Sequence, residues 1–448
     1  MKYSELLMPA GSLTKLKTAI MYGADAVYCG MPDMNLRAAT KMTVEELKEG
    51  IEFAHNQGKK VYLTLNLFTK NKDIARLPEL VKSLNELNPD GVIISDPAVF
   101  MYVKEHAPQI KRHVSTQANV CSYETVKFWQ DLGADMCVLG RETSFAELVE
   151  IKEKCPNIRL EAFIHGAMCM SYSGRCLISN FLADRSSNQG KCAHCCRWHY
   201  KVFVKKNGTT QEIEVTNEDQ IFLKEDFRED ELFEVIEDEN GSYIMNSKDL
   251  CLMPKLPHIL DAGIDCLKIE GRNKTEYYAG IVARTYRMAI DEYKNNPENW
   301  SADKYMAELD TLQNRGYTLG FYNGSVTNYD QNYNFTRTLG DYQFAGSIVE
   351  WQNDDAIFEL RNFIEAGETI EFLAPNGENI SHTFIEFEDA SDGSITQKVS
   401  AGQGKQIRIK GLDKNILPTL TIARKKVVLK EDVQKLIDNA REIFKINQ

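Results

Sequence analysis

The segment GADAVYCG, residues 23–30, carries the pattern that decides the fold of this chain. A turn-forming glycine or asparagine stands two positions before an aspartate, and a run of apolar residues follows. The same phrase returns as NPDGVIISD at residues 88–96, GADMCVLGR at 133–141 and GIDCLKIEGR at 263–272. Each apolar run follows a segment of helical periodicity, which is typical of a buried parallel strand.

Four further apolar segments occupy the gaps between these repeats, at residues 5–11, 59–66, 110–117 and 158–166. Together the two sets give eight strands, each followed by a helical stretch or an insertion. Eight strand–helix units over roughly 290 residues predict an α/β fold of the (β/α)8 TIM-barrel type rather than an open, doubly wound sheet.

The pattern changes after the seventh strand and again after the eighth. A cysteine-rich insertion follows the seventh strand, and its second half, residues 201–215, alternates like a hairpin around Asn207-Gly208. From about residue 342 the apolar period switches to two, which predicts a small C-terminal β-barrel, and an amphipathic helix ends the chain. The predicted domains are a barrel at 1–295 that includes the insertion at 169–248, a connector at 296–341, a small β-barrel at 342–426 and a terminal helix at 427–448.

The composition is that of an ordinary globular protein, with 43% hydrophobic and 26% charged residues. The N-terminal segment lacks the apolar core of a signal peptide, and no stretch approaches the ~20 apolar residues of a membrane span. We therefore predict a cytoplasmic protein with no membrane partner. The net charge of -12 counts mildly against a nucleic-acid partner, although much of it comes from the acidic run at 212–239. The sequence leaves open whether copies of the chain form a homo-oligomer.

Five of the 11 cysteines lie between residues 169 and 196. Thiolate is the soft ligand that metal centres select, so four of these cysteines could together hold a metal or an iron–sulfur cluster: Cys169, Cys176, Cys192 and Cys196. The first two are too far apart for the usual zinc spacing, whereas a cluster spans more space. The spacing therefore favours a cluster over zinc, with unliganded thiols as a third alternative. Cys195 leaves open which thiol is the fourth ligand.

Barrel enzymes place their chemistry at the C-terminal ends of the strands. Those ends carry a set of polar residues that we take as site candidates: Gln117, Arg141, His165, Glu270 and Arg272. With Arg37, the arginines are suited to bidentate capture of a carboxylate or phosphate, and surface ion pairs are the alternative. The chain has no HExxH or GxSxG motif, although a Cys169–His165 dyad stays open.

The segment from Glu161 to Ser179 resembles the signature of the collagenase-like peptidase family, peptidase family U32. The matching positions are Glu161, Phe163, Gly166, Cys169, Gly174, Cys176 and Ser179. RHVSTQAN at 112–119, LKIEGR at 267–272 and NRGYTLGF at 314–321 extend the resemblance over nearly the whole chain. The length and the NRGYTLGF segment look most similar to the members that hydroxylate tRNA.

This resemblance implies an oxygen-independent, prephenate-dependent hydroxylase that forms 5-hydroxyuridine at the tRNA wobble position. It also implies a cluster of the 4Fe–4S type on the four cysteines named above. Related members act on a cytidine of ribosomal RNA or on the ubiquinone ring, and the family name comes from reports of peptidase activity. Those substrates, peptide cleavage and a non-catalytic zinc protein that binds RNA are the alternatives.

Within this hypothesis the candidates divide into two groups. Prephenate is a dicarboxylate, so Arg272 and Arg141 would bind it, with Arg37 and Gln117 as further substrate-binding residues. His165 or Glu270 would transfer protons. The small β-barrel resembles modules that dock RNA backbone, and the basic run at 424–426 lies at its end. A role in stability or dimerisation is the alternative for that module.

Overall fold

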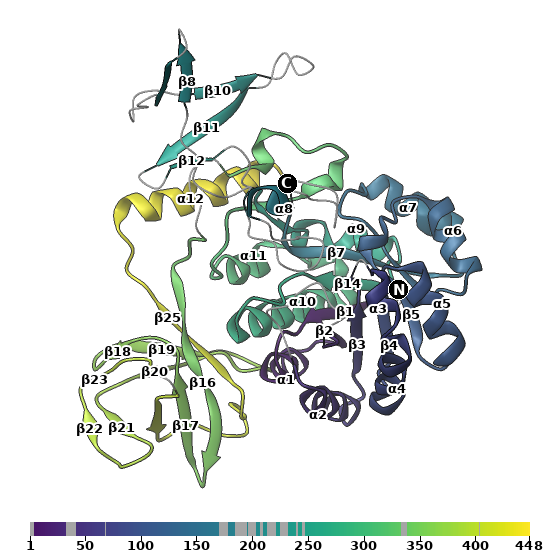
Figure 1. The fold of residues 1–448 in the computed structure, drawn as a ribbon. Helices are drawn as coiled ribbons and strands as arrows, with labels where there is room; N and C mark the ends of the chain where they lie inside the picture. The colour runs from purple at the N-terminus through teal and green to yellow at the C-terminus, as the bar shows by residue number, and fades with distance from the viewer. Residues whose placement is uncertain are drawn as a thin grey trace.

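The computed structural model of the chain describes residues 4–32, 42–67, 69–169, 178–183, 195, 203–206, 209–212, 221–224, 232–238, 241–243, 247–332, 338–402 and 404–448. A barrel ringed by helices and a smaller antiparallel sheet lie side by side (Figure 1). Among the described helices, none is both long and apolar enough to cross a bilayer.

Eight parallel strands close into the predicted barrel. They follow one another in chain order, and the last strand pairs with both the seventh and the first, which closes the ring. The strands are β1 (Glu5–Pro9), β2 (Ala26–Gly30), β3 (Lys60–Leu65), β4 (Gly91–Ile94), β5 (Lys111–Val114), β6 (Met136–Val138), β7 (Arg159–Ala167) and β14 (Cys266–Ile269). Every segment chosen from the sequence supplies one of them, because strands covered by helices are apolar along most of their length.

Helices cover the outside of the barrel (Figure 1). They are α1 (Leu13–Met21), α2 (Val44–His55), α4 (Leu77–Leu87), α5 (Pro97–His106), α6 (Tyr123–Asp131), α7 (Phe145–Lys154), α9 (Leu256–Asp261) and α10 (Glu276–Asn295), with the short α3 (Asn71–Ile74) before α4. Local sequence sets where they begin. Thr43 and Ser144, for example, accept backbone N–H groups of the first turn while Glu46 and Glu147 bond back to the cap, which stabilises each helix start.

The insertion after β7 contains the predicted hairpin. Strands β8 (Phe203–Lys206) and β9 (Thr209–Glu212) pair antiparallel, with Lys206 opposite Thr209, and the turn residues 207–208 lie outside the described residues. A helix, α8 (Ile178–Ala183), precedes the hairpin. A second antiparallel sheet, which the sequence did not predict, consists of β10 (Ile221–Lys224), β11 (Leu232–Asp238) and β12 (Gly241–Tyr243).

Two short strands extend the barrel sheet at the seam beside β7. Strand β13 (Asp249–Cys251) pairs antiparallel with the end of β7, and β15 (Tyr317–Thr318) pairs parallel with β13. These pairings bring the NRGYTLGF segment of the connector next to the C-terminal end of a barrel strand. The connector also holds a helix, α11 (Asp303–Leu309).

The C-terminal region is a curled antiparallel sheet with a core of its own around Phe358, Phe372 and Phe387. Its strands are β16 (Tyr342–Gln352), β17 (Asp355–Leu360), β19 (Thr369–Phe372), β20 (Ile380–Thr383), β21 (Phe387–Asp389), β22 (Ile395–Thr396), β24 (Gln406–Ile409) and β25 (Ile422–Lys426), and β18 (Ile364–Glu365) and β23 (Lys398–Val399) form a separate pair. In the described residues no pairing joins the outer strands β20 and β22, so the sheet forms a half-barrel. The sequence pattern predicts one strand for HTFIEFE at residues 382–388, but the structure divides this segment between β20 and β21.

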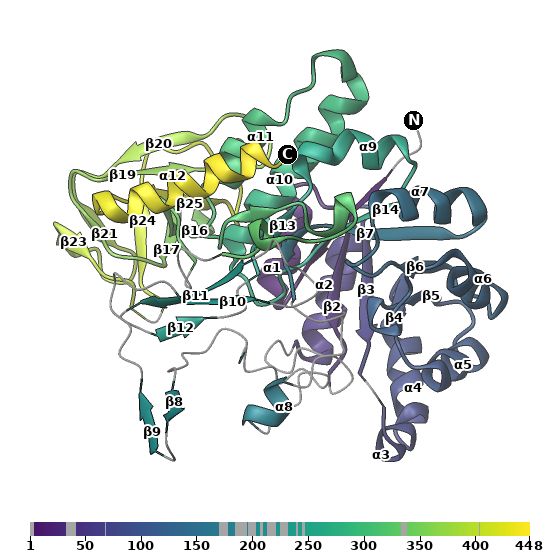
Figure 2. The same cartoon turned by 90° about the horizontal axis from the view of Figure 1, so that it is seen from above.

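A tyrosine of the barrel joins the two regions. The Tyr22 hydroxyl donates to the Leu373 carbonyl oxygen at 2.6 Å and accepts from the Ile422 backbone N–H at 3.0 Å. Burial raises the pKa of Tyr22 above its ordinary range, so the phenol stays protonated. The last helix, α12 (Glu431–Ile446), returns from the sheet, and its C-terminal end lies beside α11 in both ribbon views (Figures 1 and 2).

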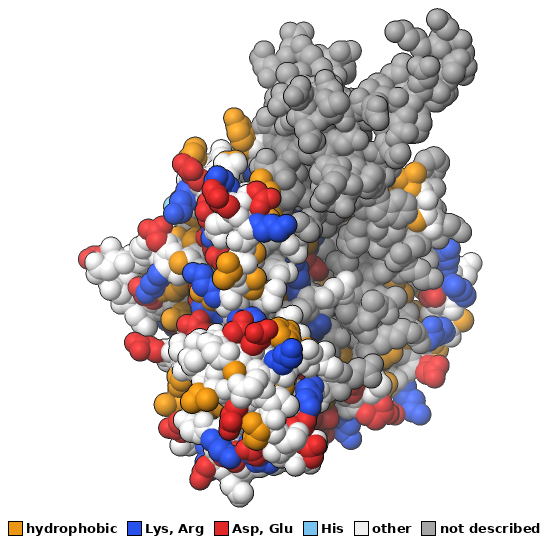
Figure 3. Space-filling view, turned by 90° about the vertical axis from the view of Figure 1, so that its left-hand side faces the viewer, with side chains coloured by type: hydrophobic (Ala, Val, Ile, Leu, Met, Phe, Trp, Pro, Cys, Tyr) orange, Lys and Arg blue, Asp and Glu red, His pale blue; other side chains and the backbone are white. Residues whose placement is uncertain are grey.

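Two residues of the basic run at the end of the small sheet form ion pairs within the chain, and one of them, Arg424, reaches the connector helix α11. The Arg424 side chain is buried and pairs with Glu308 and Glu371, and Lys425 pairs with Glu368. These contacts favour the structural alternative for the run over RNA docking. On the face shown in Figure 3, lysines and arginines are interspersed with aspartates and glutamates.

Candidate active site

Three ionisable side chains from the predicted set lie together at the C-terminal end of the barrel. Glu270 and Arg272 follow β14, and Arg141 follows β6. The Arg141 Nη2 atom lies 3.5 Å from the Glu270 Oε2 atom, and both side chains are mostly buried. Arg272 is buried as well, and its Nη1 atom donates to the Thr64 hydroxyl on β3 at 2.9 Å.

Two aromatic rings support the two guanidinium groups. The Arg141 guanidinium lies 3.8 Å from the centre of the Phe163 ring, and that of Arg272 lies 5.7 Å from the centre of the Tyr28 ring. The Tyr28 hydroxyl donates to the Ile269 carbonyl oxygen at 2.9 Å and lies 3.4 Å from a Glu270 carboxylate oxygen. A ring face attracts a cation without neutralising it, so these two ring contacts leave the charge of each guanidinium group unchanged.

A glycine permits the close approach of β7 and β14 at this point. The Glu270 N–H donates to the His165 carbonyl oxygen at 2.9 Å. Gly166 has a φ of +111°, and a Cβ atom there would lie 2.3 Å from the Glu270 carbonyl oxygen. Only glycine fits this backbone conformation without strain, and it therefore sets the position of Glu270.

Sequence reasoning did not single out the buried ion pair beneath this cluster. Lys268 of β14 donates to Glu161 of β7, and both side chains are almost fully buried. A charged residue within an otherwise apolar strand was the available signal, in LKI at 267–269 and LEAF at 160–163. Burial of such charges is costly unless they are paired, which makes them candidates for a role in the site.

His165 does not join the arginines. Its ring packs among Tyr278 and Tyr286 of α10 and Tyr317 of β15, with centroid distances of 5.6–6.0 Å. Burial lowers the pKa of His165 to about 3, and the nearby Asp249 carboxylate only partly offsets this shift. The imidazole is therefore neutral at neutral pH.

The remaining substrate-binding candidates are Gln117 and Arg37. Gln117 lies on a short turn after β5, and within the described residues its side-chain oxygen is buried without a hydrogen-bond partner. In that same part of the chain no hydrogen bond joins it to Arg141, Glu270 or Arg272. Arg37 lies outside the described residues.

Of the four predicted cluster ligands, the structure describes Cys169. This thiol is exposed two residues after the end of β7, at the same end of the barrel as Arg141 and Glu270. Its position and its soft sulfur donor fit a ligand for a metal or a cluster at the barrel mouth. Cys176, Cys192 and Cys196 lie outside the described residues, whereas Cys195 is described and buried.

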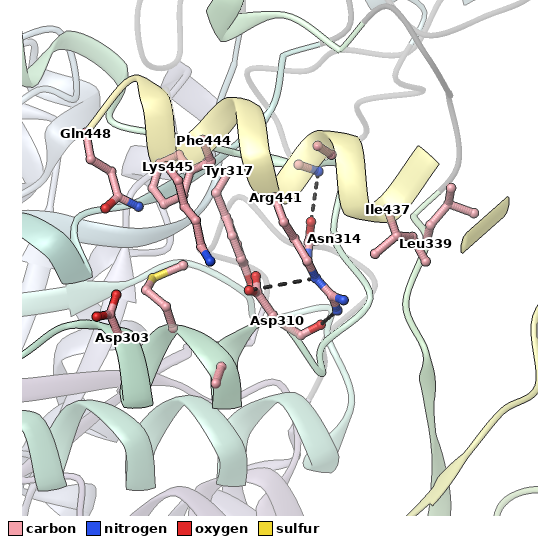
Figure 4. A pocket seen from close by; sticks show the side chains of 14 residues that line it. Asp303, Asp310, Asn314, Tyr317, Leu339, Ile437, Arg441, Phe444, Lys445 and Gln448 are labelled. Atoms are coloured by element: carbon pink, nitrogen blue, oxygen red, sulfur yellow. Dashed lines mark hydrogen bonds and ion pairs between the residues drawn. The ribbon is translucent and has the colours of Figure 1, made fainter. Parts of the chain in front are cut away.

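A cavity of about 170 Å³ lies away from the strand ends, between α11 and α12 (Figure 4). Arg441 of α12 reaches Asp310, donating to its carbonyl oxygen at 2.7 Å. Burial raises the pKa of the Asp310 carboxyl to about 6, although Arg441 acts in the opposite direction. Phe444 of α12 packs against Tyr317, whose ring also contacts His165.

Comparison with known families decides the assignment of the chain. The model of peptidase family U32 matches residues 11–332, and the model of the family's C-terminal domain matches residues 340–424. This chain belongs to peptidase family U32. The expected family resemblance and the (β/α)8 barrel with a small antiparallel domain are therefore confirmed.

Relatives in family U32 cover most of this chain. The tRNA hydroxylation protein P1 of Bacillus subtilis is 37% identical over 422 residues, covering 93% of this chain and 94% of that protein. The tRNA hydroxylation protein P of Escherichia coli is 38% identical and covers 89% of this chain and 92% of that protein. A collagenase of Porphyromonas gingivalis is 33% identical over 71% of this chain and 73% of that protein.

Three positions of the family U32 signature meet at the described site. Glu161 provides the buried carboxylate that pairs with Lys268, and the Phe163 ring packs against the Arg141 guanidinium. Gly166 lacks the Cβ atom that would clash with the Glu270 carbonyl oxygen. The signature thus includes structural determinants of the barrel mouth as well as the first predicted cluster ligand.

Proposed function

We propose that this chain hydroxylates tRNA, forming 5-hydroxyuridine at the wobble position without molecular oxygen. The observation that carries the proposal is the similarity to two proteins named for tRNA hydroxylation, at 37% and 38% identity over 93% and 89% of this chain. Bases of a single-stranded anticodon loop are readily unstacked, so a target base could enter the barrel mouth at modest cost. The reaction would take place in the cytoplasm, where tRNA is modified.

The arginines at the mouth support prephenate as the co-substrate. Prephenate has two carboxylates, and Arg141 and Arg272 present planar donors suited to such groups. Glu270 lies 3.5 Å from Arg141, close enough to orient that guanidinium and to hold or move a proton beside the bound anion. His165, which we proposed as an alternative proton carrier, is neutral and enclosed by tyrosines, so Glu270 is the stronger candidate.

Cys169, Cys176, Cys192 and Cys196 would hold an iron–sulfur cluster of the 4Fe–4S type over the mouth. Such a cluster supplies electron transfer or Lewis-acid chemistry when bound. The contribution of the chain itself is to bind the anion through arginines, to admit the base from the same side and to exclude water from the pocket.

Mass spectrometry of tRNA nucleosides from a deletion strain tests the proposal. We expect 5-hydroxyuridine derivatives to disappear in the strain and to return with the wild-type gene. A block in prephenate supply should remove them even when the gene is present. Unchanged 5-hydroxyuridine in the deletion strain would contradict the proposal, and altered ribosomal RNA cytidine or quinone pools would indicate the alternative substrates.

A peptidase is the second candidate, because one relative is named a collagenase and Cys169 is an exposed thiol. A cysteine nucleophile requires a base within hydrogen-bond reach, and the described contacts of the His165 ring are with tyrosines. Rigorously purified protein should leave collagen and peptide substrates intact. Peptide cleavage that a thiol-directed probe blocks would favour the peptidase.

A further inference from the structure

The Lys268–Glu161 pair lies one layer below the barrel mouth. Lys268 lies on β14 two residues before Glu270, which follows the strand, so Lys268 lies about 6–7 Å nearer the N-terminal end of the barrel. Its side chain is 5% exposed and that of Glu161 is 0% exposed. Lys268 stands opposite Phe163 in the pairing of β14 with β7.

The ammonium group of Lys268 contacts both rings that support the arginines. Its Nζ atom lies 4.4 Å from the centre of the Tyr28 ring and 5.5 Å from that of the Phe163 ring. Tyr28 lies beside Arg272, and Phe163 lies beside Arg141. The buried Lys268 ammonium group therefore contacts both aromatic rings that flank the arginines of the candidate anion site.

Stability alone is a poor explanation for this pair. When two charges are buried, the loss of their hydration costs about as much free energy as their mutual attraction returns. Replacing such a pair with apolar residues of similar size often leaves the protein equally stable or makes it more stable. Within the described residues the second Glu161 oxygen, Oε2, is buried without a hydrogen-bond partner. An incompletely satisfied buried carboxylate adds to the cost.

We propose that Lys268 and Glu161 form a positioning pair for a dicarboxylate bound at the barrel mouth. Lys268 fixes the Tyr28 and Phe163 rings under the two guanidinium groups, and its charge raises the positive potential at the floor of the pocket. Glu161 holds Lys268 in place and moderates that potential. The inference rests on the proposed function only in that the mouth binds a dicarboxylate.

Charge substitutions distinguish this role from simple filling of the barrel interior. A unit charge about 10 Å from a bound anion, at an effective dielectric constant of about 20, changes the binding constant roughly tenfold. Removing the cation should weaken anion binding, and removing the carboxylate should strengthen it. A pair that only fills space would give weaker binding in both variants, because either change disturbs the packing.

The experiment measures dissociation constants by isothermal titration calorimetry with the full-length chain, purified without oxygen and with its cluster reconstituted. The probes are prephenate and malonate, and the variants are Lys268→Met, Glu161→Gln and the double substitution. We expect binding about tenfold weaker in Lys268→Met, about three- to tenfold tighter in Glu161→Gln, and within about threefold of wild type in the double variant. If Lys268→Met does not fold, Glu161→Gln alone decides, and unchanged or weaker binding overturns the proposal.

Glu5→Gln is the matched control. Glu5 is also a buried barrel carboxylate, but it lies at the opposite end, where Lys60 donates to it at 2.6 Å. Its removal should leave both dissociation constants within about twofold, and a larger gain in affinity would overturn the local role of Glu161. If the wild-type protein binds malonate but not prephenate, the proposed function is contradicted. The malonate affinities of the variants would then still support the positioning role of Lys268 and Glu161. Wild-type protein that binds neither anion would overturn the inference.

Discussion

The two ends of the barrel both hold buried charge, yet they stabilise it by different means. At the N-terminal end the Glu5 carboxylate accepts hydrogen bonds from Lys60 at 2.6 Å and Tyr62 at 2.7 Å. Arg159 lies 3.4 Å from the same carboxylate. Lys60 and Arg159 are the first residues of their strands, and Tyr62 is the third residue of β3. At this end of the barrel, opposite charges therefore meet directly.

At the C-terminal end the described partners of the guanidinium groups include aromatic rings and a hydroxyl. Arg141 stacks on Phe163 and reaches Glu270 only at 3.5 Å, and Arg272 contacts Tyr28 and Thr64. The comparison shows how one fold separates stability from binding. Opposite charges meet directly at the closed end, whereas aromatic rings without net charge flank the guanidinium groups at the open end, where we expect the anion to bind.

Replacing an arginine at the open end should give the largest effect. We expect Arg272→Met to slow tRNA hydroxylation at least about 30-fold, because loss of a buried charged contact to a ligand costs about 2–5 kcal/mol. Initial rates with purified tRNA and prephenate measure the loss. Arg159→Met removes an arginine at the closed end and should keep the rate within about threefold. Equal losses in the two variants would abolish the distinction between the ends.

Gly166→Ala should be the most damaging change to the backbone of the open end. The added methyl group would meet the Glu270 carbonyl oxygen at 2.3 Å in a conformation with a φ of +111°. We expect a loss of about 3 kcal/mol in the free energy of unfolding, measured by urea denaturation. Gly58→Ala is the control, because Gly58 has a φ of +65° and no neighbouring atom within 4 Å of its added Cβ. That control should lose only about 1 kcal/mol.

Glu5→Gln should weaken the closed end without affecting the open one. Neutralising this carboxylate leaves Lys60 and Arg159 without their shared counter-charge, although both are partly exposed and water replaces some of the interaction. We expect the free energy of unfolding to fall by about 1–2 kcal/mol. Calorimetric unfolding gives this value, and the Michaelis constant for prephenate should not change. A shifted Michaelis constant would show that the two ends are coupled.

His165→Gln should alter how stability depends on pH. The pKa of His165 is about 3 in the folded chain, below its ordinary value near 6.5. Between these pH values the unfolded chain binds a proton that the folded chain excludes. The wild type therefore loses stability as the pH falls below about 6.5, by at most about 1.4 kcal/mol per pH unit for this group.

The His165→Gln variant has no imidazole to take up a proton on unfolding. Its free energy of unfolding should therefore change less steeply between pH 7 and pH 5. Urea unfolding at several pH values measures the two slopes. Parallel slopes would mean that the imidazole is protonated in the folded chain, as a proton carrier near the open end would be.

The strands could be predicted from the sequence because a buried parallel strand is apolar along its length, as in GVII of β4. The hairpin of β8 and β9 followed from Asn207-Gly208, which favours a tight turn. Strands β13 and β15 escaped prediction because three- and two-residue strands carry no periodicity, and the pairings of β13 with β7 and of β15 with β13 are tertiary contacts.

Side-chain direction at the site was harder to predict than strand position. Phe163 pairs with Lys268, whereas His165 pairs with Ile269, so Ile164 is an extra residue on β7. Without this bulge, His165 would face the same side as Phe163 by the alternation of a strand. The bulge instead directs it to the tyrosines of α10, and a one-residue irregularity leaves no trace in sequence periodicity.

The double hydrogen bond of Tyr22 sets a condition for chimaeras assembled from related proteins. A single phenol oxygen satisfies one backbone acceptor and one backbone donor of the neighbouring sheet, at Leu373 and Ile422. A chimaera that combines this barrel with the small sheet of a relative keeps both of these interface hydrogen bonds only if a hydroxyl lies at the same position. Recombination within the family should therefore depend in part on the residue that follows α1, far from the fusion point in the chain.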